Sequence, residues 1–297
     1  HYVEKESILD KEAFNRATSI YLVDRVVPML PEILSNNVCS LRPQEEKYTF
    51  SAIFSINNKG EILEEWFGKS AIKSNRRFSY AEAQEIIETR KGKIRKEIAL
   101  KKKEYKVKEE TVKAILILNE IATTLRKERK RQGSINFNKK EIMFKLDEKK
   151  NPTEVIFKES KEANKLIEEF MLLANKKVAE LFKKLKKEPS VYRIHDAPDK
   201  EKLKALKTIV KEFGYSLDIS SREGTSRTLN KLLVEVKGTK EQNLIETLAI
   251  RSMSKAEYST QNIGHYGLGF KDYTHFTSPI RRYPDILVHR LLNECLN

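Results

Sequence analysis

The sequence predicts an α+β fold, because strand-like segments gather early in the chain and helix-like segments late, without regular alternation. Residues 48–56 and 61–74 are rich in apolar and β-branched side chains on either side of an Asn-Lys-Gly turn, which predicts a β-hairpin. Residues 161–187 carry apolar side chains at helical spacing on a wide face, which predicts a long helix. No internal repeat is visible.

The segments around the hairpin carry local signals of their own. Residues 9–25 predict a short helix followed by a tight segment. Residues 26–43 are apolar but contain three prolines, which predicts a buried irregular loop with one helical turn. Residues 78–88 predict a helix capped by Ser79, because a serine side chain can accept a backbone N–H of the first turn.

Residues 91–133 hold most of the basic charge. They contain fifteen Lys or Arg and six Glu, and so carry +9 of the chain's net +15. Apolar and small side chains recur in this segment at helical spacing, at Val112, Ile115, Leu116, Asn119, Ala122 and Leu125. The segment therefore predicts one long, basic, amphipathic helix. Its charge is either a solvated face or a surface for a polyanion.

The second half predicts short strands and several helices. Strands are expected at 134–137 and within 141–158, with a turn at 149–152. Residues 264–270 contain three glycines and predict a bend. The other expected elements are the helix at 161–187, a strand at 191–194, helices at 199–213, 226–236 and 241–252, and a loop that runs into a helix at 277–296.

Composition excludes several classes of protein. Of 297 residues, 39% are hydrophobic and 34% charged, mean hydropathy is −0.59, and no apolar run is long enough for a transmembrane helix. Cys39 and Cys295 are too far apart in sequence for a metal-binding or redox pair, and their scarcity fits a reducing compartment. We therefore expect a cytoplasmic protein with no membrane partner. The excess of 58 basic over 43 acidic residues favours a polyanionic partner.

Few motifs carry recognisable chemistry. The five histidines show no zinc spacing, and no nucleotide-binding glycine loop or nucleophile elbow is present, so no metal site is predicted from them. Arg281 and Arg282 follow Ser278 at the expected start of a helix. Two guanidinium groups near a helix N-terminus suit a phosphate group, but an ion pair with Asp285 or with a neighbouring glutamate fits equally well.

Five segments together resemble a known catalytic domain. They are YLVDRVVPMLPEILSNNVCSL at 21–41, NKLIEEFMLLAN at 164–175, YRIHDAPD at 192–199, RSMSKAEYS at 251–259, and GHYGLGFKDYTHFTSPIRRYPDILVHR at 264–290. In order and spacing they resemble the RNB catalytic domain of the ribonuclease II and ribonuclease R family. Within this family the sequence is more similar to bacterial ribonuclease R. The resemblance implies that residues 1–297 form the C-terminal, larger part of a single RNB domain.

The resemblance also implies a function. Members of the family are processive hydrolytic exoribonucleases, which use Mg²⁺ to release nucleoside 5′-monophosphates from the 3′ end of single-stranded RNA. Arg281 matches the catalytic arginine of the family. Tyr21, Phe137 and Glu168 match residues that hold the terminal bases, whereas core packing for the two aromatics and solvation for Glu168 are the alternatives. Further residues expected to shape the phosphate pocket are Tyr273, Thr277, Ser278, Arg282 and His265.

The sequence also departs from the family. None of its eight aspartates reproduces the aspartate-rich metal motif, and the cold-shock and S1 domains of whole family members are missing. From this and from the start at HYV we expect a fragment, inactive alone and without bound Mg²⁺. We expect a monomer that binds single-stranded RNA without DNA specificity. The alternatives are a non-catalytic RNA-binding derivative of the family and a basic scaffold protein whose charge serves only solubility.

Overall fold

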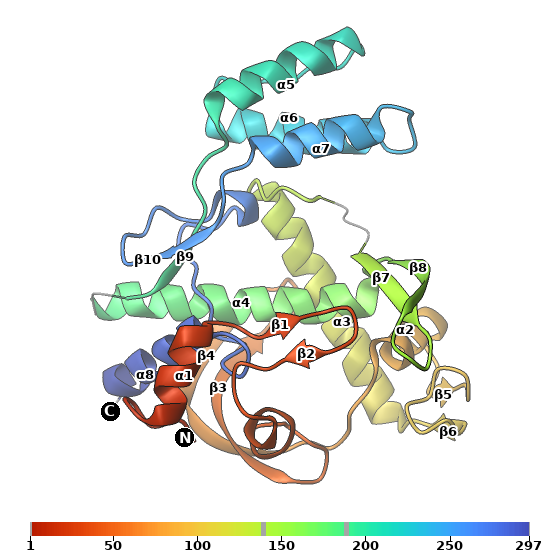
Figure 1. Ribbon diagram of the computed structural model, residues 1–297, viewed down its shortest axis with the longest axis vertical. Helices are drawn as coiled ribbons and strands as arrows, with labels where there is room; N and C mark the ends of the chain where they lie inside the picture. The colour runs from red at the N-terminus through yellow and green to blue at the C-terminus, as the bar shows by residue number, and fades with distance from the viewer. Residues whose placement is uncertain (1, 138–140, 187–189, 297) are drawn as a thin grey trace. The chain divides into compact units, whose positions relative to one another are not determined.

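The computed structural model describes residues 2–137, 141–186 and 190–296, and the chain divides into two compact units (Figure 1). Unit 1 comprises His1–Leu125, Lys140–Asn175 and His275–Asn297, and unit 2 comprises Arg126–Lys139 and Lys176–Thr274. All strands of the described residues pair antiparallel, in two-stranded sheets, and most of them come early in the chain, whereas helices predominate later. The predicted α+β class is confirmed. None of the described helices is long and apolar enough to cross a membrane.

Unit 1 begins with short elements, as the sequence predicts. They are α1 (Ile8–Arg16), the pair β1 (Ile20–Tyr21) and β2 (Val26–Val27), and a π-helical turn, η1 (Ile33–Val38). Helix α1 is joined to the C-terminal helix α8 (Tyr283–Leu296), because Asp10 accepts hydrogen bonds from Tyr283 Oη and Arg290 Nη2, both at 2.8 Å. In the proline-rich segment only Met29 and Leu30 are buried, and they pack on the same cluster as Tyr283.

The predicted hairpin is confirmed as β3 (Glu46–Ile56) and β4 (Ile62–Lys73). Its turn closes because the side-chain oxygen of Asn57 accepts the N–H groups of Lys59 and Glu61. Gly60 has φ +79°, a left-handed conformation that a residue without a Cβ adopts without strain.

Helix α2 (Tyr80–Thr89) begins where the serine cap predicts. The Ser79 hydroxyl accepts the N–H of Glu82, and the Glu82 carboxylate accepts the N–H of Ser79 at 2.7 Å. Glu82 is only 1% exposed and also accepts from Leu100 N (3.0 Å) and Tyr105 Oη (2.7 Å). Burial alone would raise the pKa of Glu82, but these hydrogen bonds outweigh it and lower the pKa.

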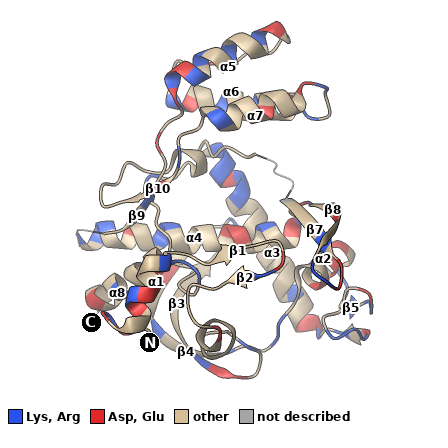
Figure 2. Cartoon of the chain, viewed as in Figure 1, with Lys and Arg blue, Asp and Glu red and all other residues tan. Residues whose placement is uncertain are grey.

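The basic helix is shorter than predicted. Helix α3 spans Glu109–Arg131, whereas the preceding basic residues fold into the small pair β5 (Lys93–Ile94) and β6 (Tyr105–Lys106). The physical reason is tertiary: Ile94 and Val107 are buried against α2, and Glu82 holds the loop between the strands. Figure 2, which colours Lys and Arg blue, shows basic residues concentrated at the C-terminal end of α3.

The next pair, β7 (Glu141–Leu146) and β8 (Pro152–Lys158), turns through Asp147, whose side chain accepts two backbone N–H groups. Residues 134–137 are not the predicted strand. Their backbone groups bond elsewhere in unit 2, Ile135 N to Gly267 O and Ser134 O to the Asn230 side chain, so no strand partner is needed.

Helix α4 (Glu162–Leu185) confirms the strongest helical prediction. In unit 2 the predicted strand is β9 (Tyr192–Ile194), which pairs with an unpredicted strand, β10 (Glu257–Ser259). Three predicted helices follow, α5 (Lys200–Glu212), α6 (Arg222–Glu235) and α7 (Gln242–Ser252), and Figure 1 shows them side by side. Their common core is apolar, with Leu206, Leu229, Leu232 and Ile245 all fully or almost fully buried.

Candidate functional site

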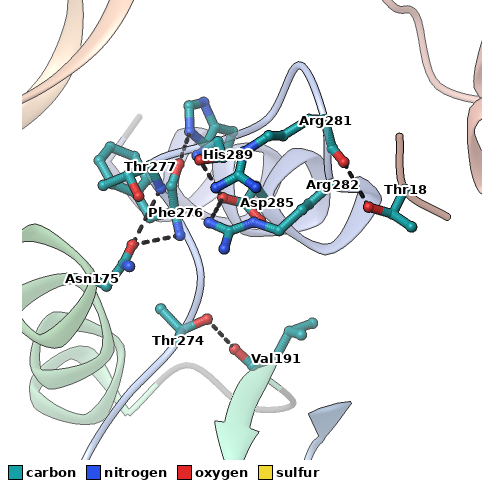
Figure 3. A network of polar contacts seen from close by, with 11 residues as sticks. Thr18, Asn175, Val191, Thr274, Phe276, Thr277, Arg281, Arg282, Asp285 and His289 are labelled. Atoms are coloured by element: carbon teal, nitrogen blue, oxygen red, sulfur yellow. Dashed lines mark hydrogen bonds and ion pairs between the residues drawn. The ribbon is translucent and has the colours of Figure 1, made fainter. Parts of the chain in front are cut away.

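The loop that precedes α8 is held at its start by helix α4. Asn175, which is 3% exposed, accepts the backbone N–H of Phe276 at 2.8 Å and that of Thr277 at 3.2 Å through its side-chain oxygen (Figure 3). A buried amide that caps two consecutive N–H groups fixes the backbone at these residues. Sequence reasoning assigned Asn175 no role, because only the tertiary fold brings it to the loop.

Aromatic packing fixes the same part of the loop. The Phe276 ring stacks on the His289 ring at 4.6 Å and meets Phe50 edge-on at 6.0 Å. Burial lowers the pKa of His289, and its Nε2–H donates to the carbonyl oxygen of Phe276 at 2.8 Å. His289 is therefore a neutral, structural histidine at neutral pH.

The adjacent arginines differ in their partners. Asp285, fully buried, accepts from Arg282 Nε and Nη2, both at 2.8 Å, and from the backbone N–H of Ser278 at 2.7 Å (Figure 3). The ion pair with Asp285 is thus formed by Arg282. The Arg281 guanidinium has no hydrogen-bond or ion-pair partner within residues 2–137, 141–186 and 190–296.

The backbone of Arg281 is nevertheless anchored. Its carbonyl oxygen accepts from the Thr18 hydroxyl at 2.9 Å and from the backbone N–H of Ser19 at 3.0 Å. The side chain is half-buried and leaves the turn in the same direction as that of Arg282 in Figure 3. A cation without a counter-ion on a fixed backbone is suited to a phosphate group.

Two other predicted pocket residues lie in this loop. The Thr277 hydroxyl is buried without a partner in the described part of the chain, so it remains available as donor or acceptor. The Ser278 carbonyl oxygen accepts the N–H groups of Arg281 (3.2 Å) and Arg282 (3.1 Å), which closes the turn. The structure therefore brings four predicted residues together, Thr277, Ser278, Arg281 and Arg282.

Tyr21 belongs to the same neighbourhood within unit 1. It pairs with Val26 in the β1–β2 hairpin and is 63% exposed. Ser19, two residues earlier, is the donor to the Arg281 carbonyl, so the hairpin that presents the Tyr21 ring joins the arginine loop. Glu168 is exposed on α4 whereas Glu169 is 3% exposed, so Glu168 is the glutamate that faces solvent.

His265, Tyr273 and Phe137 lie in unit 2. The His265 ring contacts Tyr273 edge-on at 5.3 Å and His195 at 4.9 Å, and its Nδ1 accepts the N–H of Leu268. Burial, with the positive charges of His195 and Arg193 nearby, lowers the pKa of His265 to about 3. Tyr273 is 4% exposed, and Phe137 is half-buried against the helical core of unit 2.

The described carboxylates do not form a metal site. No group of three or more His, Cys, Asp or Glu side chains converges among the described residues. Buried aspartates are already committed to protein partners: Asp10 to Arg290, Asp285 to Arg282, and Asp272 to Lys183. This donor set does not fit the oxygen-rich shell that Mg²⁺ requires, and we derive no chemical step through a metal.

Comparison with known proteins assigns the chain to a family. The RNB domain family matches residues 1–297, and the chain belongs to that family. It is 40% identical to Ribonuclease R 2 of Lactococcus lactis over 293 residues, which is 99% of this chain and 42% of that protein. It is also 40% identical to DIS3-like exonuclease 2 of Schizosaccharomyces pombe over 309 residues, covering 100% of this chain and 32% of that protein.

Solved structures agree with this assignment. The apo form of Mycoplasma genitalium RNase R superposes with a TM-score of 0.88 at 32% identity, and the match covers 98% of this chain and 44% of that chain. The same enzyme in complex with ribose-methylated single-stranded RNA superposes with a TM-score of 0.87. The chain thus spans about two fifths of the length of the Lactococcus and Mycoplasma proteins.

Proposed function

We propose that this chain is the larger part of the RNB domain of a hydrolytic exoribonuclease that degrades single-stranded RNA processively from its 3′ end. The observation that carries the proposal is the Arg281 guanidinium, a cation on an anchored loop that has no counter-ion in the part of the chain that the structure describes. Relatives named Ribonuclease R and an RNA complex of such an enzyme support RNA as the substrate. Release of nucleoside 5′-monophosphates, with Mg²⁺ as cofactor of the whole enzyme, completes the proposal.

In this mechanism Arg281 stabilises charge on the reacting phosphate. Negative charge accumulates on the non-bridging oxygens as the nucleophile attacks, and a fixed bidentate cation interacts more strongly with that state than with the ground state. The Thr277 hydroxyl, which has no partner among the described residues, would donate to the same phosphate. In unit 1, Ser278 and Arg282 hold the backbone of the arginine loop through Asp285, whereas in unit 2 His265 and Tyr273 pack ring against ring.

In this proposal the RNA bases are bound by side chains whose contacts do not depend on the identity of the base. Tyr21 and Phe137 stack on terminal bases, each worth on the order of 1–3 kcal/mol, and Glu168 accepts hydrogen bonds from the terminal nucleotide. Every base has a flat face, so such contacts suit an enzyme that advances one nucleotide at a time.

A second candidate is a non-catalytic RNA-binding protein of the same family. The observation that favours it is the 36% identity, over 305 residues, to a protein named Inactive exonuclease DIS3L2 from Arabidopsis thaliana, of which the match covers 29%. Binding of RNA without cleavage by the whole protein in Mg²⁺ would support this candidate.

Substitution of Arg281 in the whole enzyme tests the proposed function. Arg281→Ala is expected to lower the single-turnover rate of RNA cleavage by about two to three decades while the Kd for RNA changes little. Arg281→Lys should recover only part of the loss, because an ammonium cannot reproduce the guanidinium fork. The matched control is Arg77→Ala, at an exposed loop position, which should leave the rate unchanged.

Two results would contradict the catalytic role. An Arg281→Ala enzyme that cleaves at the normal rate would exclude it outright. A loss of affinity in proportion to the loss of rate would show that Arg281 binds the ground state instead.

A further inference from the structure

Asp285 lies in the first turn of α8 and is completely buried. Both of its oxygens are used. One accepts from the Ser278 backbone and from Arg282 Nη2, and the other accepts from Arg282 Nε. Burial of a carboxylate costs free energy unless hydrogen bonds satisfy its lone pairs, as they do here. The contacts of Asp285 are therefore a specific feature of the fold.

These contacts enclose Arg281 in a closed turn. Ser278 at its start and Arg282 at its end are both bound to Asp285, and the Ser278 carbonyl accepts the N–H groups of Arg281 and Arg282. On the outer side, Thr18 and Ser19 hold the Arg281 carbonyl. The backbone that carries Arg281 is therefore fixed from two directions (Figure 3).

The pairing also decides which arginine stays available. Asp285 offers one carboxylate to two adjacent guanidinium groups, and Arg282 occupies both oxygens in a bidentate contact with a side chain only 15% exposed. If Arg282 were absent, the unsatisfied carboxylate would attract the neighbouring Arg281 and neutralise it. The Arg282–Asp285 pair thus holds the turn and keeps the Arg281 charge free.

We propose that Asp285 and Arg282 are positioning residues for Arg281, which they orient and protect from neutralisation without themselves binding the reacting phosphate. The inference rests on the proposed function, because it assigns to the pair a task in the reaction of Arg281. It predicts that both residues affect cleavage only as long as Arg281 is present.

A double-mutant cycle in the whole enzyme tests this coupling. Asp285→Asn should lower the single-turnover cleavage rate about ten- to a hundredfold, as expected for loss of charge-assisted hydrogen bonds, with little change in Kd for RNA. In an Arg281→Ala background the same substitution should change the rate by less than about twofold. Asp196→Asn, at an exposed loop position, is the matched control and should have no effect in either background.

Two milder variants keep the test decisive if Asp285→Asn unfolds. Thr18→Val, at an exposed position, removes the hydroxyl bond to the Arg281 carbonyl together with a longer one to the Ser19 carbonyl (3.4 Å), and should lower the rate about threefold, again only when Arg281 is present. Arg282→Lys retains a charge for Asp285 and should keep more activity than Arg282→Ala. Thermal unfolding midpoints identify any variant that is lost through folding.

The outcomes separate the two proposals. If Arg281→Ala does not slow cleavage, the proposed function fails. If Arg281→Ala slows cleavage but the Asp285 and Thr18 effects multiply with it, the function stands and the positioning role is wrong. Equal activity of Arg282→Lys and Arg282→Ala would overturn the protection from neutralisation.

Discussion

At the scale of single residues, environment and not residue type decides function in this loop. Arg281 and Arg282 are adjacent and chemically identical, yet one is bound by a buried carboxylate and the other has no counter-ion among the described residues. The same contrast separates the two candidate stacking residues. Tyr21 is 63% exposed on a short strand, whereas Phe137 packs against a helical core.

Alanine substitutions of the two aromatics are therefore expected to differ. Tyr21→Ala should weaken binding of single-stranded RNA by about 1–3 kcal/mol and leave the urea midpoint of unfolding almost unchanged, because its ring packs on little protein. Phe137→Ala should lower both RNA affinity and the urea midpoint. Fluorescence titration with an RNA oligomer and urea denaturation measure the two effects. An unchanged affinity for Tyr21→Ala would contradict its assigned role.

The histidines predict how stability depends on pH. The pKa of His265 is about 3 in the folded protein and about 6.5 in the unfolded chain, so between these values the unfolded state binds one more proton at this site. The free energy of unfolding therefore falls as pH drops below about 6.5, by up to about 1.4 kcal/mol per pH unit from this residue. Burial lowers the pKa of His195 and His289 as well, which acts in the same direction.

Replacement of His265 isolates its share of this effect. His265→Phe keeps a ring against Tyr273 but cannot take up a proton. Its free energy of unfolding should fall less steeply than that of the original protein when urea titrations at pH 7.5 and pH 5.5 are compared. Parallel pH dependences would show that His265 titrates normally in the folded state.

At the scale of elements, the basic segment 91–108 combines apolar residues that pack in the core with basic residues that face solvent. Its residues Ile94, Ala99 and Val107 are buried in the same cluster as Ile86 of α2, whereas all nine of its Lys and Arg side chains are exposed. In the described chain only Lys93 and Arg95 of these nine form ion pairs, with Glu104 and Glu85. Charge that remains uncompensated on a firmly packed support is suited to the phosphate backbone of RNA.

Neutralising part of this surface should change the salt dependence of RNA binding. If the side chains of 101–103 each contact one phosphate, changing all three lysines to Gln should reduce the slope of log K against log salt by about 2. The matched control is Lys→Gln at exposed positions 200, 202 and 211 of α5, which should leave the slope nearly unchanged. Equal reductions in both variants would show that only net charge matters.

At the scale of the whole molecule, the basic charge that favours RNA binding is separate from the carboxylates that metal-dependent hydrolysis needs. The net charge of +15 and the available Arg281 favour binding of RNA, whereas the described aspartates are engaged by protein partners. Binding and hydrolysis should therefore be separable in the isolated chain.

The purified chain of 297 residues is expected to bind single-stranded RNA without base preference and to lose affinity steeply as salt rises. It is expected not to hydrolyse a labelled RNA oligomer in Mg²⁺, because none of its eight aspartates reproduces the aspartate-rich metal motif that the family resemblance calls for. Gel analysis of the RNA and filter binding at several salt concentrations measure both. Stepwise release of mononucleotides by the chain would contradict the second expectation.

The sequence by itself determined the elements whose signals are local. The hairpin of β3 and β4 follows from an Asn-Lys-Gly turn, α2 begins at the serine that caps it, and α4 follows from a sustained helical period. The five motif segments also identified the RNB family, which the comparisons confirm. In each case the deciding residues are close together in the chain.

Only the tertiary structure decided what depends on distant partners. Residues 91–108 are rich in helix formers but form β5 and β6, because their apolar side chains are buried against α2 and Glu82 binds their loop. Residues 134–137 bond to a loop and a side chain instead of a strand. Whether the adjacent arginines bind a phosphate or Asp285 was open from the local sequence, and the folded geometry gives Asp285 to Arg282, since one buried carboxylate satisfies one guanidinium.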